Sequence, residues 1–127
     1  MSAQFAMHHH TDSPAYYDII IDRENAMSIF RIDHYDILDF LDGTEVKAEE
    51  IDPGGADSAT REIPAGSGNG TVRLFDTGSC AIERWVPPVY VIQVASRQLD
   101  GTLHILKVEE GYSLRYVRSR YKKPSPR

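Results

Sequence analysis

The chain has 127 residues, of which 41% are hydrophobic and 26% are charged, and its formal net charge is −5. This length and composition indicate one globular domain and exclude a fully disordered chain, and the single cysteine, Cys80, excludes a disulfide framework. No apolar run reaches the roughly 18–20 residues of a membrane-spanning helix, so we expect a cytoplasmic protein without a membrane partner.

The N-terminal residues 1–13 show no sustained periodicity, so we expect a flexible segment there. Within it, His8, His10 and Asp12 are candidate ligands for a transition metal. A flexible segment must become ordered before it can bind a metal, and no second set of ligands is visible. The sequence therefore predicts neither a metal site nor a cofactor.

Two β-strands are predicted next, at residues 15–22 and 27–32, because aromatic and β-branched residues are dense there. A short turn separates them, which indicates a hairpin.

Residues 33–42 favour a short helix. Asp33 can cap its N-terminus, Leu38 and Leu41 belong to an apolar stripe, and Gly43 can end it. The alternative is the first arm of a hairpin, because an Asp-Gly pair between apolar runs is also a hairpin signal. In that alternative, residues 44–51 alternate as the second arm of the hairpin.

Residues 52–70 differ in composition from the rest of the chain, with five glycines and two prolines among 19 residues. Such a segment is longer than the irregular loops of compact domains usually are. It is either a functional flap or a disordered loop.

The remainder of the chain is predicted to be β-structure. Turn signals such as Pro-Pro and Asp-Gly separate five candidate strands, at residues 71–75, 79–85, 89–97, 102–109 and 112–121. Short connections between consecutive strands predict an antiparallel meander.

Together these elements predict a β-rich α+β fold. We expect one curved or partly closed antiparallel sheet of five to seven strands, with one short helix near residues 33–42. A single domain is expected over residues 14–121, followed by a basic tail at residues 122–127. The expected core includes Leu38 and Val108.

No catalytic motif occurs with the required spacing. An active site would therefore need ionisable side chains that only the fold brings together, and the candidates are Tyr16, Tyr17, His34, Asp36, Asp39 and His104. On a helix, Asp36 and Asp39 lie on one face, for which a solvated outer surface is the simpler explanation.

The last predicted strand combines tyrosines with cations. Residues 1–111 hold 8 basic and 19 acidic residues, whereas residues 112–127 hold 6 basic residues and no acidic one. The candidate binding residues are Arg115, Tyr116, Arg118, Arg120 and Tyr121. Such residues are typical of single-stranded nucleic-acid binding, but also of a strand protected against edge pairing. Because an acidic body repels phosphate, a protein partner is favoured over nucleic acid.

These observations favour a non-catalytic binding module for a protein partner or a small ligand. One alternative is a small cofactor-independent enzyme with an Asp, Tyr or His pocket in a curved sheet. A second alternative is single-stranded nucleic-acid binding through the basic C-terminal strand. We also expect a homodimer in which Arg115, Arg118 and Arg120 face acidic residues of the other chain.

Overall fold

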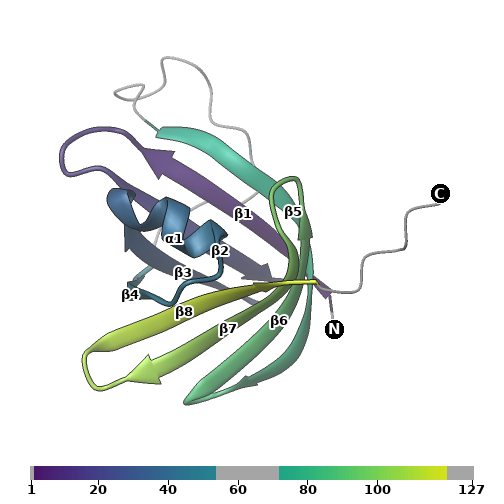
Figure 1. Cartoon of the computed structure of the whole chain (residues 1–127). Coiled ribbons are helices and arrows are strands. Elements are labelled where there is room, and N and C mark those ends of the chain that lie inside the picture. The colour runs from purple at the N-terminus through teal and green to yellow at the C-terminus, as the bar shows by residue number, and fades with distance from the viewer. Residues whose placement is uncertain (1, 54–71, 120–127) are drawn as a thin grey trace.

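The computed structural model describes residues 2–53 and 72–119, in which eight antiparallel strands form a closed barrel (Figure 1). The strands are β1 (Ser2–His10), β2 (Tyr16–Arg23), β3 (Ala26–Asp33), β4 (Val46–Ile51), β5 (Val72–Val86), β6 (Val89–Ser96), β7 (Asp100–Val108) and β8 (Gly111–Arg118). A 3₁₀ turn, η1 (His34–Asp36), and a short helix, α1 (Ile37–Leu41), connect β3 to β4.

The barrel consists of two four-stranded meanders joined along both edges. Its strand order is β1-β2-β3-β4-β8-β7-β6-β5, so the pairs β1–β5 and β4–β8 close the sheet. Strands make up 71% of the structure and helix 8%. The prediction of an α+β fold with a partly closed sheet of five to seven strands is therefore wrong, because both edges are paired.

Strand β1 is the element that the sequence interpretation missed. Residues 1–13 were expected to be flexible, yet β1 pairs with β2 on one side and with β5 on the other. Phe5 and Met7 point into the barrel and are fully buried, whereas Ala6 is buried in a separate cluster on the outer face. Because both faces of β1 are apolar here, the two-residue alternation of a half-buried strand is hidden.

Strand β5 is longer than predicted, since residues 71–75 and 79–85 were expected to be two strands. The Asp-Thr-Gly sequence at residues 76–78 is not a turn. At Gly78 a Cβ atom would lie 2.3 Å from the carbonyl oxygen of Ala95 on β6, so the two backbones approach too closely for any other residue. The glycine marks close contact between strands rather than a chain reversal.

The helix predicted near residues 33–42 is present, and the hairpin alternative for this segment is wrong. The Asp33 side chain accepts a hydrogen bond from the backbone of Tyr35, and Gly43 ends the helical segment with a φ of 93°. The buried side of the helix differs from the prediction. Phe40 is fully buried, whereas Leu38 is 75% exposed.

Alternating side chains from all eight strands fill the barrel interior. Seven strands contribute two or three buried residues each to one continuous apolar cluster, and β5 contributes Cys80 together with the partly buried Phe75, Ile82 and Trp85. The cluster also includes Phe5, Ile19, Phe30, Val46, Ile92, Leu103 and Leu114. An eight-stranded barrel is just wide enough for side chains to fill. Val108, expected in this core, lies on the outer face and is 39% exposed.

The two ends of the barrel differ. At the helix end, η1 and α1 connect the strands and Phe40 packs into the core. At the opposite end, which we call the mouth, the chain reverses in three hairpins: β2–β3, β5–β6 and β7–β8. No helix in the described ranges is long and apolar enough to cross a membrane. The expectations for residues 54–70 and for the tail at residues 122–127 lie outside the described residues.

Asp76 holds the turn between β6 and β7. It is fully buried, and its Oδ1 accepts hydrogen bonds from the backbone N–H groups of Thr77, Arg97 and Gln98 at 2.8, 2.9 and 3.2 Å. The Ser96 hydroxyl donates to its Oδ2 at 2.7 Å. The carboxylate therefore satisfies several donors that would otherwise be buried without partners.

We predict that Asp76→Ala lowers the free energy of unfolding by about 3 kcal/mol, because buried donors lose a charged acceptor. Urea denaturation followed by circular dichroism measures the change. Asp39→Ala serves as the control, since Asp39 is exposed on α1, and should change the free energy by less than about 0.5 kcal/mol. Equal effects of the two substitutions would contradict the assigned role of Asp76.

Candidate functional site

The six candidate catalytic residues do not converge on one place. Tyr16 lies on the outer face of β2 and His104 on the outer face of β7, remote from each other in the strand order. Asp36 and Asp39 belong to the helical connection, and Asp39 is exposed. The structure brings together only Tyr17 and His34, at the helix end.

A third residue, His9, joins Tyr17 and His34 in a stack of rings at the helix end. The ring centroids of His9 and Tyr17 are 4.0 Å apart and their planes are nearly parallel. His9 Nε2 lies 3.0 Å from His34 Nδ1, which is hydrogen-bond distance. Such a bond requires one ring to donate and the other to accept, so at least one of the two histidines is neutral.

Burial lowers the pKa of His9, and the neighbouring His34 and His10 lower it further. A histidine pair with a tyrosine beside it contains groups that can exchange a proton. The described residues contain no group of three or more His, Cys, Asp or Glu side chains arranged to hold a metal ion. The ring of His10, one of the candidate metal ligands, stacks on that of Tyr16 with centroids 4.3 Å apart.

The lowered pKa of His9 predicts a dependence of stability on pH. Below its ordinary value of 6.5, the unfolded chain takes up a proton at this position that the folded protein resists. The free energy of unfolding should therefore decrease as the pH falls from about 6.5 through the lowered pKa of His9.

Thermal melts at about pH 7.5 and about pH 5.5 measure this effect. The wild type should lose more thermal stability between the two pH values than His9→Gln. His104→Gln, altered at an exposed histidine on the outer face, should lose as much as the wild type. If His9→Gln and the wild type lose the same thermal stability between the two pH values, the His9–His34 contact does not control the pH dependence of stability.

Tyr16 belongs to a charged cluster on the outer face. Arg31 donates two hydrogen bonds to Asp18, at 2.8 and 3.1 Å, and its guanidinium lies 3.7 Å from the centre of the Tyr16 ring. These residues face one another across β2 and β3. Since every charged group in the cluster has a partner, its role is to stabilise the strand pairing.

The mouth of the barrel carries a different set of residues, which we call the mouth belt. Its members point inward from seven neighbouring strands, β2 to β8, and combine three aromatic rings, two cations, one carboxylate and one serine hydroxyl. They are Arg23, Ser28, Glu50, Trp85, Tyr90, Lys107 and Tyr112.

Three aromatic rings of the mouth belt form a row with a cation at each end. The centroids of Trp85 and Tyr90 are 4.7 Å apart, and those of Tyr90 and Tyr112 are 6.4 Å apart. The Arg23 guanidinium lies 4.4 Å from the Trp85 ring centre, and the Lys107 amine lies 5.0 Å from that of Tyr112. Both contacts have the geometry of cation–π interactions.

Within the mouth belt, Arg23 is the residue with a buried hydrogen-bond donor that lacks a partner in the described ranges. Its Nε atom is buried and has no hydrogen-bond partner among the described residues. Its Nη2 has one long contact, 3.4 Å, to the hydroxyl of Ser28. Between described residues the single ion pair is Arg31–Asp18, so Arg23 has no carboxylate partner there.

The carboxylate of the mouth belt already has a partner. The Tyr112 hydroxyl donates a hydrogen bond to Glu50 Oε1 at 2.9 Å. Burial raises the pKa of Tyr112, and the neighbouring Glu50 raises it further, so the phenol keeps its proton and remains a donor. The Cys80 thiol is deeper in the barrel, and burial raises its pKa to about 11, which disfavours the nucleophilic thiolate.

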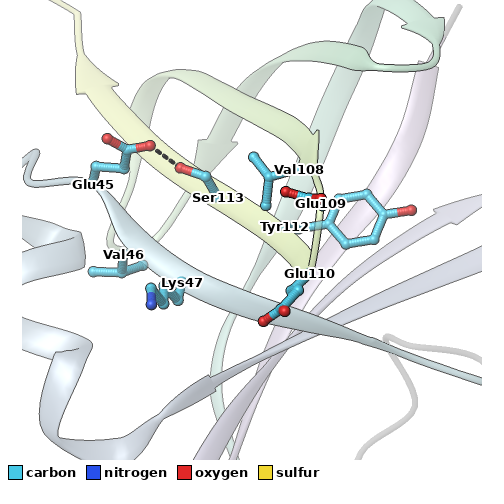
Figure 2. A pocket seen from close by; sticks show the side chains of 8 residues that line it. All are labelled: Glu45, Val46, Lys47, Val108, Glu109, Glu110, Tyr112 and Ser113. Carbon is cyan, nitrogen blue, oxygen red and sulfur yellow. Dashed lines mark hydrogen bonds between the residues drawn. The ribbon is translucent and has the colours of Figure 1, made fainter.

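Two grooves lie beside β8 on the outside of the barrel. The larger has a volume of 580 Å³ and lies between β4 and the β7–β8 hairpin (Figure 2). The smaller, of 360 Å³, includes His104 and Arg115. Both are lined by Glu45 and Ser113, whose side chains are hydrogen-bonded to each other.

The candidate binding residues of β8 divide between its two faces. Arg115 lies on the outer face, in the smaller groove. Tyr116 is buried in the barrel, where its hydroxyl accepts a hydrogen bond from the backbone of Asp100 at 2.7 Å. Arg118 lies beside Gly43 at the helix end. Arg120 and Tyr121 lie outside the described residues. The described members therefore form no continuous basic and aromatic surface.

The comparisons with known proteins give no family. No protein-family model matches the chain. A search of curated proteins found no match either.

Sequence reasoning did not find the mouth belt, because its residues come from seven strands scattered between positions 23 and 112. One signal was available. Arg23 directly follows the predicted strand at residues 15–22, and Lys107 lies near the end of the predicted strand at residues 102–109. Each continues the inward-facing alternation of its strand, which would place a cation at the barrel rim.

Proposed function

We propose that this protein is a non-catalytic binding module that takes a small ligand at the mouth of its barrel. The observation that carries the proposal is Arg23, an inward-pointing cation that lies over the Trp85 ring and whose buried Nε finds no acceptor in the part of the chain that the structure describes. Leaving a buried donor without a partner costs free energy, and a ligand can supply that partner. Barrel mouths are also common places for small-ligand sites.

Two further features support a binding role. Phe40 packs into the apolar cluster at the helix end, whereas inward positions at the mouth carry the polar groups of Arg23, Ser28 and Lys107. The mouth belt has no nucleophile with an adjacent base, because its carboxylate is bound to Tyr112.

The free, buried thiol of Cys80 supports a reducing, cytoplasmic location.

The single tryptophan of the chain provides the test, because Trp85 lies within the proposed site. Its indole N–H gives one resolved signal in a ¹H–¹⁵N spectrum. We predict that at least one small aromatic probe from the set benzoate, phenyl phosphate, benzyl alcohol and benzylamine shifts this signal in a saturable manner. Affinities should be about millimolar, as expected for ligands of this size.

Tyr90→Ala, which removes the middle ring of the aromatic row, should weaken binding of that probe several-fold. The control is Val117→Ala, an exposed position on the outer face of β8, which should leave binding unchanged. If no probe gives a saturable shift of Trp85, or if only residues of the outer grooves respond, the proposal of a mouth site is wrong.

A second candidate function is self-association through the outer face of β7 and β8. Leu106, Val108 and Val117 are each about 40% exposed there. The larger groove brings the carboxylates of Glu109 and Glu110 to the hairpin end of this face, and the smaller groove places His104 and Arg115 further along the strands. A two-fold axis between antiparallel copies would place the acidic hairpin end of each copy beside the basic residues of the other.

We predict that a homodimer formed in this way dissociates when Leu106 and Val117 are both changed to Asp, because apolar burial supplies most of the association energy. Light scattering coupled to gel filtration measures the molar mass. Leu38→Asp, which places the same charge on the exposed helix residue, should leave the mass unchanged. A wild-type mass equal to that of one chain at high concentration would exclude this second function.

A further inference from the structure

We infer that the mouth selects an anionic ligand, namely a carboxylate or phosphate attached to a planar apolar body, and that Arg23 binds its charged group. This inference rests on the proposed function and specifies the ligand of the same site. It follows from which groups in the mouth belt have partners and which do not.

The guanidinium of Arg23 carries five N–H donors, and the described residues provide one long contact to them, from Ser28. A guanidinium in the wall of a barrel is partly removed from water, which raises the cost of unpaired donors. Its planar fork matches the oxygens of a carboxylate or phosphate. An anion would therefore gain charge-assisted hydrogen bonds that the protein itself does not provide.

Nearby groups complete such a site. Stacking on Trp85 fixes the plane of the Arg23 guanidinium, so little conformational entropy remains to be lost on binding. The Ser28 hydroxyl lies beside it as a further donor. The faces of Trp85 and Tyr90, with centroids 4.7 Å apart, form an apolar wall for the planar body of the ligand.

The charges of the mouth belt argue against a cationic ligand. Arg23 and Lys107 carry two positive charges, and Glu50 carries one negative charge that already accepts a hydrogen bond from Tyr112. A cation on the aromatic row would meet Arg23 at one end and Lys107 at the other, while the carboxylates of the mouth hairpins, Glu24, Glu109 and Glu110, lie in the turns outside the row. An anion meets one cation at each end of that row.

The experiment compares four probes that share a phenyl ring: benzoate, phenyl phosphate, the neutral benzyl alcohol and the cationic benzylamine. Dissociation constants are measured by NMR titration of the Trp85 indole signal, with the full chain. We expect benzoate or phenyl phosphate to bind roughly 10-fold or more tightly than benzyl alcohol, as one charge-assisted interaction provides. The stronger of the two anions identifies whether the head group is a carboxylate or a phosphate.

Substitution of the arginine then assigns the effect to Arg23. Arg23→Gln should abolish the preference for the anion over benzyl alcohol, whereas Arg23→Lys, which keeps the charge without the planar fork, should retain part of it. Arg84→Gln is the matched control, because Arg84 is exposed one residue from Trp85 and donates to the backbone of Val89. This control should bind all four probes as the wild type does. The ¹H–¹⁵N spectrum of each variant verifies that it is folded.

The outcomes separate this inference from the proposed function. The inference is wrong, while the mouth site stands, if all four probes bind equally or if benzylamine binds most tightly. The same conclusion follows if folded Arg23→Gln and Arg23→Lys both retain the full preference for the anion. If Arg23→Gln does not fold, Arg23→Lys decides, since full retention of the preference overturns the inference and partial loss supports it. If none of the probes binds, both proposals are wrong.

Discussion

Closure of the sheet is the constraint on which the rest of this structure depends. Strands β1 and β5 pair along one seam, and β4 pairs with β8 along the other, so no full-length edge is left. A closed barrel of eight strands has an interior of fixed width, which one layer of side chains from each strand must fill. The alternation of residues along each strand therefore determines what lies inside, and the ends of the strands determine what lies at the two ends of the barrel.

This constraint gives the two ends their different chemistry. At the helix end, Phe40 is inserted into the barrel from α1, so that end is filled by an apolar side chain. Among the described residues, no such element follows the hairpins at the mouth. Inward positions there are occupied by Arg23, Ser28 and Lys107, and their polar groups meet the aromatic row instead of the apolar core. The ligand site proposed for the mouth is a consequence of this difference.

The polar clusters of the molecule differ in how completely their groups are satisfied. Asp76 accepts four hydrogen bonds, and Arg31 is held by both oxygens of Asp18, so these clusters explain stability. Arg23 has a ring contact and one long hydrogen bond, but its Nε has no acceptor within residues 2–53 and 72–119. A buried donor without an acceptor costs free energy, so such a residue is better explained by binding than by folding.

Much of the local structure could be predicted from the sequence, because strands and turns follow from residue type and short-range periodicity. The sequence determined the β2–β3 hairpin, the short helix capped by Asp33, and the meander of β6, β7 and β8. Only the tertiary structure decided that the sheet closes, since β1 is apolar on both faces and its partner β5 is about 70 residues away in the chain. The same holds for the mouth belt. The closure of the barrel brings Arg23 and Trp85 together. No local sequence pattern indicates a contact between strands so far apart in the chain.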